Sequence, residues 1–260
     1  MLNHLHLLYN YRYLVWMWIL RDIKIRYKQS LLGAAWAILQ PLSLMLIFTL
    51  VFSFFVRIPT DGIPYPIFAY VAILPWTLFS TSLNFGIPSL VSNMNLLTKI
   101  YFPREILPLT PVGASLFDFL IGFSFFLIFM IFYQVPVFIT ILWVPVLLVI
   151  QIALTIGVSL FASAINVFYR DIRFLVPLVI QLWFYATPVI YPYSAVPEWL
   201  RPVYSLNPMV GIIDSYRRVI LLGQSPSLPL ISISAGVSIL LVVLAYSYFK
   251  RVEWKFADLI

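Results

Sequence analysis

The sequence contains no cysteine, only two histidines and few charges. The absence of cysteine excludes disulfide bonds and thiolate metal sites, and His4 and His6, both near the start, are too few to build a metal centre alone. Charged residues make up 10% of the chain and hydrophobic residues 63%, whereas soluble domains are about a quarter charged. So few charges cannot cover a soluble globule of 260 residues. The composition therefore predicts an all-α membrane protein with several spans.

Two functions are also excluded by what is missing. The phosphate loop Gly-x-x-x-x-Gly-Lys-Ser/Thr does not occur, so any step driven by ATP needs a separate ATPase chain, which would also hold the ATP and Mg. The net charge is +7, but the basic residues lie at the ends of apolar runs and form no stripe, which argues against nucleic acid as a partner. We therefore expect no catalytic residue, no metal site and no bound cofactor in this chain.

Long uncharged runs make up most of the sequence. About 20 apolar residues cross the hydrocarbon core as a helix, and the chain has six such runs. They cover residues 31–56, 66–90, 111–133, 137–166, 174–191 and 228–249. A tight hairpin is expected at 133–136, where glutamine and proline interrupt the third and fourth runs, and a short charged turn at 169–173. No cleavable signal peptide is evident, so we expect the first span to direct insertion. Residues 31–260 thus form one transmembrane domain.

The basic residues predict how the chain is oriented. Six spans place both termini on one side, and a cytoplasmic N-terminus then puts twelve of the 16 basic residues inside. The four that remain outside are Arg57, Arg201, Arg217 and Arg218. Inner segments of membrane proteins carry this kind of excess, so both termini are predicted to be cytoplasmic.

Two segments are too polar to span. Residues 1–30 are predicted as an amphipathic interface helix, because 5–29 alternates aromatic and basic residues and places Arg21, Lys24 and Lys28 on one helical face. Residues 192–222 hold four prolines among charges and aromatics. They are predicted as short re-entrant helices in the outer leaflet, before the last span.

Five stretches, in order over nearly the whole chain, resemble one transporter family. They are RDIKIRYKQSLLGAAW at 21–36, NLLTKIYFPREILP at 95–108, FYRD at 168–171, PVIYP at 188–192, and NPM at 207–209 with YR at 216–217. Together they resemble ABC-2-type permeases that export polysaccharides, closest to the lipopolysaccharide O-antigen exporters of the Wzm type and the wall teichoic acid exporters. The resemblance implies a permease subunit, itself no enzyme, of a bacterial inner-membrane exporter for lipid-linked polysaccharide.

The resemblance also implies the partners of the chain. They are a second copy of itself, two ATP-binding-cassette ATPase subunits, an undecaprenyl-pyrophosphate-type lipid-linked glycan and membrane lipids. In the family, the loop between spans two and three is a coupling helix that docks on the ATPase, and its apolar stripe suits a helix-in-groove contact. Asn95 is expected to cap this helix and Pro103 to bend or end it. The residues assigned to coupling are Asn95, Leu97, Lys99, Tyr101, Phe102, Arg104 and Glu105.

Basic and aromatic side chains offer two kinds of substrate contact. The basic residues of the interface helix either hold it at the inner face or attract a lipid-linked pyrophosphate headgroup, and both interpretations stay open. They are Arg21, Lys24, Arg26 and Lys28. Flat aromatic rings can stack on sugars, so six of them are candidates for a channel lining, although lipid contact or core packing explains any single one. They are Phe48, Phe52, Phe55, Trp183, Phe184 and Tyr185.

Acidic residues in or near the membrane are few. Asp118 is the one acid within a predicted span, and with no second acid or histidine in a span we expect it to form a hydrogen bond within or between helices, not a proton relay. The charged residues of the re-entrant segment either pair into an outer gate or are ordinary surface charges. They are Glu198, Arg201, Asp214, Arg217 and Arg218.

Other functions fit the sequence less well. A related ABC-2 permease for a drug or small lipid would share most of these features. An intramembrane glycan polymerase or ligase needs clustered acid, base or arginine groups near the membrane face, and the chain has one intramembrane acid and no long polar outer loop. A secondary transporter is disfavoured because the sequence shows no internal repeat.

Overall fold

The computed structural model describes residues 9–28, 30–56, 62–169 and 171–256. It is helical, with no strand among these residues, as the composition predicts. Within the described ranges, five helices are long and apolar enough to cross a membrane: Gly33–Ser53, Tyr65–Gly86, Ile106–Phe132, Ile139–Phe168 and Leu228–Lys255. The predicted fifth span is a shorter apolar helix, α9 (Ile172–Tyr185, 14 residues). The structure thus confirms a helical membrane protein with five candidate spans, one fewer than the six predicted.

Several spans are composite helices. The first joins a 3-10 turn, α3 and a π-helical end: η1 (Gly33–Ala35), α3 (Trp36–Thr49) and η2 (Leu50–Phe55). The next two are α4 (Tyr65–Gly86) and α7 (Ile106–Phe132). The fourth joins η3 (Ile139–Trp143) to α8 (Val144–Phe168), and the last joins α12 (Leu228–Val252) to η5 (Glu253–Lys255). All but α9 agree with the predicted runs within a few residues.

The predicted hairpin between the third and fourth spans is confirmed. α7 ends at Phe132, and Gln134 adopts a positive φ of 55°. Left-handed backbone of this kind reverses the chain and is uncommon outside glycine. The charged turn that follows α8 is also present, between Phe168 and Ile172, although Arg170 lies outside the described residues.

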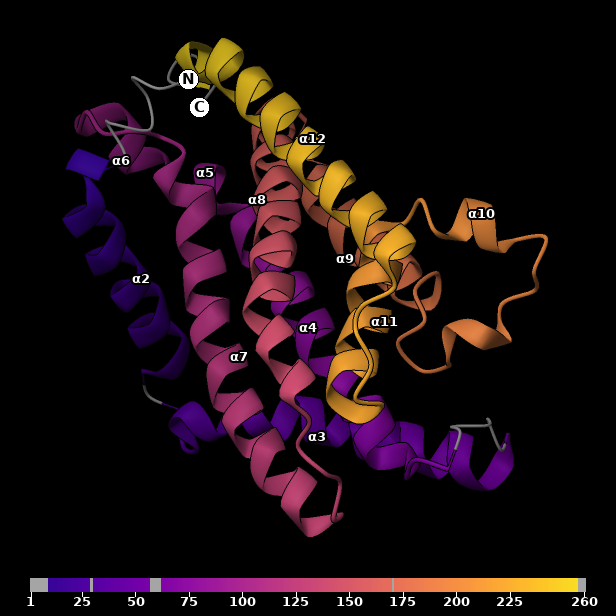
Figure 1. Cartoon of the computed structure of the whole chain (residues 1–260). Helices are drawn as coiled ribbons and strands as arrows, with labels where there is room; N and C mark the ends of the chain where they lie inside the picture. Colours follow the sequence, from indigo (N-terminus) through magenta and orange to yellow (C-terminus); the bar gives the residue numbers. More distant parts are fainter. Residues whose placement is uncertain (1–8, 29, 57–61, 170, 257–260) are drawn as a thin grey trace.

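α8 and α12 run side by side in the same direction. The rings of Phe161 and Tyr248 are 5.5 Å apart, and those of Phe168 and Phe256 are 6.3 Å apart. Figure 1 shows the two helices rising together toward the end where α12 terminates. We call this the proximal end of the bundle, and the end where α4 and α12 begin the distal end. Because α8 and α12 are parallel, residues 169–227 must return from the proximal to the distal end.

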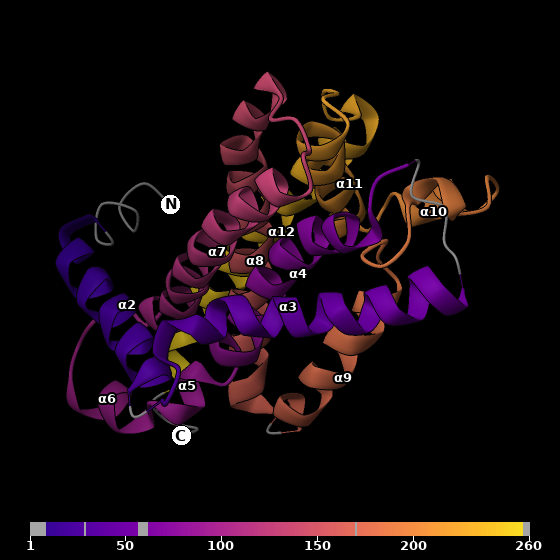
Figure 2. The same ribbon diagram turned by 90° about the horizontal axis from the view of Figure 1, so that it is seen from below.

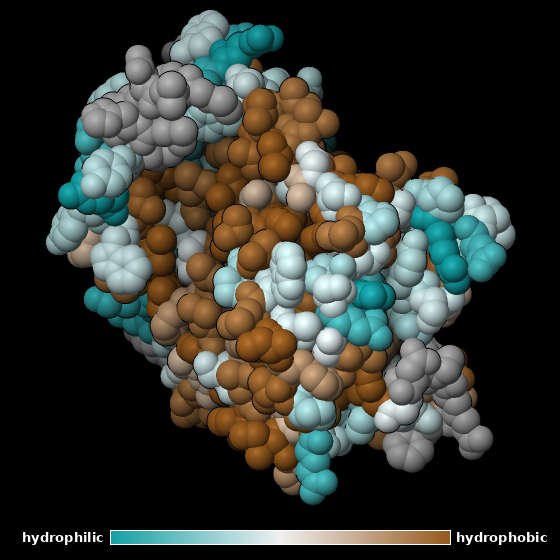
Figure 3. Space-filling model, in the orientation of Figure 1, coloured by the Kyte–Doolittle hydropathy of each residue, from teal (hydrophilic) through white to brown (hydrophobic). Residues whose placement is uncertain are grey.

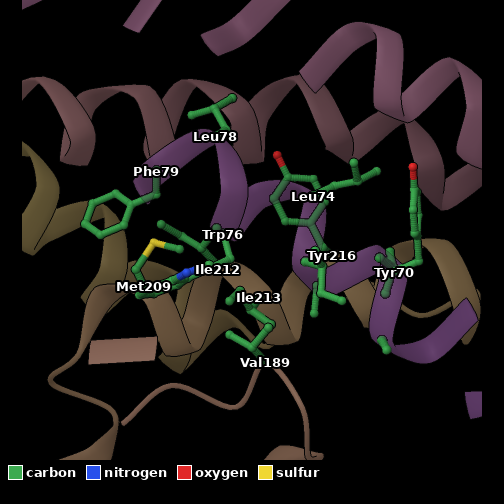
Figure 4. Close-up of a cluster of buried hydrophobic side chains, with 14 of the residues drawn as sticks. Tyr70, Leu74, Trp76, Leu78, Phe79, Val189, Met209, Ile212, Ile213 and Tyr216 are labelled. Carbon is green, nitrogen blue, oxygen red and sulfur yellow. The ribbon is translucent and has the colours of Figure 1, made fainter. Parts of the chain in front are cut away.

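The returning segment contains a buried helix. After η4 (Tyr193–Ala195) and α10 (Arg201–Tyr204), α11 (Pro208–Leu221) packs against α4, α8 and α12. Figure 4 shows Met209, Ile212, Ile213 and Tyr216 of this helix facing the α4 side chains. Short helices in 192–222 were predicted, and the structure shows that one of them is a core element.

Asn207 explains where α11 begins. Its side-chain Oδ1 accepts a hydrogen bond from the backbone N–H of Met209 at 3.1 Å, and Pro208 occupies the first helical position. The same oxygen accepts from Trp183 Nε1 at 2.9 Å. The side-chain amide donates to the carbonyl of Ala186 at 3.1 Å. Asn207 therefore starts α11 and also ties it to the end of α9.

The N-terminal helix α2 (Arg12–Tyr27) lies along the first half of α7 (Figures 1 and 2). The rings of Trp18 and Phe102 are 5.3 Å apart, and a Cβ added to Gly113 would come within 2.5 Å of Ile19 Cδ1. The predicted helix 5–29 is therefore helical over most of its described part and packs on a span. Residues 5–8 and Gln29, with the two histidines, lie outside the described residues.

The outer surface of the bundle is apolar. Large hydrophobic side chains at the distal ends of α7 and η3 are mostly exposed, among them Ile131, Phe132 and Ile139. Figure 3 shows hydrophobic residues over much of the visible face, with hydrophilic residues gathered near the end of α12, over α2 and over α10. Such a surface suits a hydrocarbon surrounding with polar ends.

Candidate functional site

The loop predicted to couple to an ATPase lies at the proximal end and has two faces. It contains α5 (Ser89–Ser92) and α6 (Met94–Lys99). Tyr101 is 92% exposed, and Asn95 and Lys99 are also exposed. Leu97 and Phe102 point inward and belong to a buried cluster with the end of α12. The loop therefore has a packing side and an exposed side, and its apolar residues are divided between the two.

The predicted ends of the coupling helix are wrong in detail. The residue before α6 is Asn93, not Asn95, and its side-chain amide donates backward to the carbonyl of Ser89 at 2.8 Å. The helix ends at Lys99, with Ile100 already extended. Pro103 therefore follows the helix and does not terminate it. The chain extends over residues 100–103 before α7, which is what exposes Tyr101.

A buried ion pair anchors this loop to the last span. Glu105 is 1% exposed, and its Oε2 lies 2.8 Å from Lys250 Nζ. Lys250 also pairs with Glu253 at 3.0 Å, and Arg104 donates to the backbone carbonyl of Glu253. We call Arg104, Glu105, Lys250 and Glu253 the proximal clamp. A buried carboxylate is tolerated because a cation reaches it directly.

The basic residues of α2 are not equivalent. Lys24 and Lys28 are exposed. Arg21 is held by its neighbour: its Nη2 lies 2.9 Å from Asp22 Oδ1, and its guanidinium is 4.2 Å from the Trp18 ring centre. Asp22 in turn accepts a hydrogen bond from Thr110 of α7 at 2.8 Å. Two of the four predicted headgroup contacts are therefore accessible, and one is partly occupied.

The fourth basic residue, Arg26, forms an ion pair with Asp118 of α7. Tyr27 also donates a hydrogen bond to Asp118, with an oxygen–oxygen distance of 2.5 Å. Burial, and then this hydrogen bond, raise the pKa of Tyr27 above its ordinary value. The predicted hydrogen bond between helices is thus present. Its partners come from α2 and not from another span, and the arginine gives the acid a charged partner that the sequence did not suggest.

Five of the six aromatic candidates, all but Phe55, belong to a group of ring contacts between α3, α4 and α9. Phe48 stacks on Phe184 with ring centres 5.7 Å apart, and Trp183 meets Phe79 edge-on at 5.0 Å. Phe184 is buried and Phe48, Phe52 and Trp183 are half-buried. Phe55 (84% exposed) and Tyr185 are the two exposed rings, although Tyr185 also meets Phe184 edge-on at 5.4 Å. The structure therefore divides these residues into a packing set and an exposed pair.

Sequence reasoning missed a polar stripe on α4. This helix is the most buried of the candidate spans, yet Thr77, Ser80, Thr81 and Asn84 remain partly or fully exposed. Thr77 and Thr81 line a recess of about 240 Å³ that also contains Gln40, Arg26 and Asp118. Hydroxyl and amide groups at positions i, i+3, i+4 and i+7 share one helical face. That spacing, visible in the sequence, was the signal for it.

Arg217, on α11, is buried and bonded to backbone. It is 5% exposed, and its guanidinium donates to the carbonyls of Pro188 at 2.5 Å, Tyr191 at 2.9 Å, and Val189. Its Cζ lies 3.7 Å from the ring centre of Phe68. Arg217 is therefore not an ordinary surface charge. It holds the chain that follows α9 against α4.

Comparison with known proteins agrees with this architecture. The family described as ABC-2 type transporter matches residues 13–221. The O-antigen export system permease protein RfbA of Myxococcus xanthus is 35% identical over 96% of each chain, and that of Klebsiella pneumoniae is 30% identical over 92% of each. The polysialic acid transport protein KpsM of Escherichia coli is 22% identical over 85% of this chain and 83% of its own. The chain therefore belongs to the ABC-2 type transporter family.

Proposed function

We propose that the chain is the permease subunit of an ABC exporter that moves a lipid-linked polysaccharide across a bacterial inner membrane. The observation that carries the proposal is the 35% identity with an O-antigen export permease over 96% of both chains. ATP and Mg belong to a separate ATPase subunit, because the chain has no phosphate loop. Two copies of the permease, each with one ATPase subunit, form the working assembly.

In this proposal both termini lie on the cytoplasmic side. The parallel arrangement of α8 and α12 supports a sixth crossing of the bundle between them. At about 1.5 Å per residue, α9 alone would reach only about two thirds of a hydrocarbon core of about 30 Å. The segment that includes α11 completes the crossing from the outer side. Six crossings return the end of α12 to the side where α2 begins.

The exposed face of the coupling loop makes the ATPase contact. Asn95, Lys99 and Tyr101 form this face. The inward residues have a different role: through Leu97, Phe102 and the proximal clamp they connect the loop to α12. A displacement of the loop by the ATPase is therefore transmitted to α12 through the Glu105–Lys250 ion pair. It is transmitted to α2 through the contact of Phe102 with Trp18.

The substrate path lies between two copies of the chain. Six spans enclose no wide channel, so two protomers are needed for a sugar chain to pass. Phe55, Tyr185 and the polar stripe of α4 supply aromatic and hydrogen-bonding surface for such a path. Lys24 and Lys28, both exposed, attract the pyrophosphate headgroup at the inner face.

Export by cells that lack their own O-antigen permease tests the proposal. The chain is expressed with an ATP-binding-cassette ATPase that co-purifies with it, and surface polysaccharide is measured. Tyr101→Ala should abolish export and uncouple ATP hydrolysis. The membrane level of the permease should be unchanged, because a side chain that is 92% exposed contributes little to packing. Ile128→Ala, an exposed position on α7 away from the loop, is the matched control. Transport of a drug or small lipid without polysaccharide export would contradict the proposal.

A further inference from the structure

The distal end contains a recess with an unusual charge. We call it the distal pocket: its volume is about 320 Å³, and it lies between the start of α4, the chain around Tyr193, α11 and the start of α12. Four charged residues line its described part, namely Arg201, Asp214, Arg217 and Arg218. Three cations therefore face one acid.

All three arginines are fixed in place by backbone carbonyls. Besides the three carbonyls held by Arg217, Arg201 donates from Nε to the carbonyl of Val196 at 3.0 Å and from Nη2 to that of Ser194 at 3.2 Å. Arg218 donates from Nε to the carbonyl of Ser225 at 3.1 Å. Carbonyls orient a guanidinium without cancelling its charge. The cations are therefore positioned in advance, at little further cost in side-chain entropy when an anion binds.

Acidic groups do not neutralise this pocket. Glu198 lies 3.5 Å from Arg201, but its side chain is 91% exposed, and exposed pairs contribute little. Asp214 is near enough to Arg217 and Arg218 to attract both, but it forms no ion pair with the described residues, and one acid leaves two of the three positive charges uncompensated. The Nε–H of Arg217 is buried and has no hydrogen-bond partner there. A buried donor without a partner is costly, and an anion in the pocket would lower that cost.

The location of these arginines at the outer face calls for a local explanation. Cations are rare at the outer face of membrane proteins, and in the orientation proposed above only four of the 16 basic residues lie there. Three of the four line this one pocket. The pocket also lies where α4 and α12 begin, which is the level of lipid headgroups. Leu221, Leu222 and Leu230 add an apolar wall to it.

We propose that the distal pocket binds the phosphate group of a lipid. A phosphate or diphosphate accepts charge-assisted hydrogen bonds from several arginines at once, and the apolar wall accommodates the first carbons of the attached chain. Two sources share this chemistry, a membrane phospholipid and a polyprenyl diphosphate. The inference concerns the phosphate and is independent of which compound the assembly exports.

Native mass spectrometry of the full permease–ATPase complex tests the proposal. The complex is titrated with phosphatidylglycerol and with undecaprenyl diphosphate, each compared with the same lipid lacking phosphate, dioleoylglycerol and undecaprenol. Arg218→Gln and Arg201→Gln are the test variants, because each arginine has fewer structural bonds than Arg217. Arg251→Gln, an exposed cation at the proximal end, removes the same charge elsewhere and is the control. A thermal scan of each variant checks folding.

We expect phosphate-bearing lipids to bind more tightly than their phosphate-free partners, and Arg218→Gln to weaken that binding about tenfold, the effect of losing one charge-assisted hydrogen bond. Arg218→Lys should restore part of it, and Arg251→Gln should have no effect. Loss for both phosphate lipids identifies a general phospholipid site; loss for the diphosphate alone identifies a site for the polyprenyl carrier. Equal binding by wild type, Arg218→Gln and Arg201→Gln, or equal loss with Arg251→Gln, overturns the proposal.

Discussion

The two ends of the bundle handle buried charge differently. In the proximal half of the bundle two acids meet cations: the buried Glu105 pairs with Lys250, and the part-buried Asp118 pairs with Arg26. At the distal end Arg217, the most buried cation there among the described residues, is held by backbone carbonyls and the Phe68 ring and by no ion pair. A pair between two elements fixes those elements to each other and leaves no net charge. A cation held by carbonyls fixes the chain equally well and keeps its charge available, so structural and binding roles can coexist at the distal end.

Removing the cation of Arg217 should lower the stability of the permease more than any other change considered. Arg217→Met leaves three buried carbonyls without their donor, and at about 1–3 kcal/mol for each unsatisfied group we expect the free energy of unfolding to fall by at least about 3 kcal/mol. The midpoint of thermal unfolding of the purified permease in detergent measures this. Arg218→Met is the control: this next residue donates to the carbonyl of Ser225, and its loss should shift the midpoint much less. Equal shifts would show that the carbonyl contacts of Arg217 are not special.

The motifs that carry the family resemblance illustrate how far the sequence could predict this end. PVIYP and YR were recognised as separate stretches, and the sequence suggested for Arg217 only a gate or a surface charge. In the structure Arg217 bonds to the carbonyls of that same PVIYP stretch, and Asn207 bonds to Trp183 and Ala186. Hydropathy predicts which segments are apolar, but it contains no information on which distant motifs meet.

Breaking the proximal clamp should give the second-largest loss of stability. Glu105→Gln leaves Lys250 without its main partner, and loss of one member of a buried pair costs about 3–5 kcal/mol. Lys250 keeps Glu253 at 3.0 Å, so we expect the lower part of that range. The double variant Glu105→Gln with Lys250→Met should be less destabilised than the sum of the singles, with a coupling of about 1–3 kcal/mol. Additive singles would show that the two residues do not interact in the folded state.

The span predictions succeeded where a helix is apolar throughout and failed where it is short. Five spans were placed within a few residues, because uncharged runs of sufficient length are diagnostic. α9 ends at Tyr185, although the apolar composition continues to 191. Pro188 and Pro192 follow within a few residues, and two prolines so close together disfavour a continuing helix, whereas α9 tolerates the single Pro177. Asp118 shows a second limit: its partners Arg26 and Tyr27 lie more than 90 positions earlier in the chain, beyond any local pattern.

Releasing α2 from α7 should have a smaller and more local effect. Asp118→Asn removes the charge that pairs with Arg26 and weakens the hydrogen bond from Tyr27. Asp22 and Thr110 remain bonded, so we expect a loss of about 1–2 kcal/mol confined to α2. Hydrogen exchange of the backbone amides should become faster in α2 and stay unchanged in α12. Faster exchange throughout the bundle would mean that the pair supports the whole fold.

Alanine substitutions at two glycines should change stability least. They test whether close packing between helices contributes to stability independently of charge. A Cβ on Gly157 would lie 3.0 Å from the backbone of both Leu241 and Val242, so α8 and α12 would have to separate slightly. A Cβ on Gly236 meets nothing within 4 Å. Alanine improves helix propensity by up to about 1 kcal/mol at either position. We therefore expect Gly236→Ala to raise the unfolding midpoint slightly and Gly157→Ala to lower it or leave it unchanged. If Gly157→Ala stabilised the permease as much as Gly236→Ala, the parallel contact of α8 and α12 would be loose at this position.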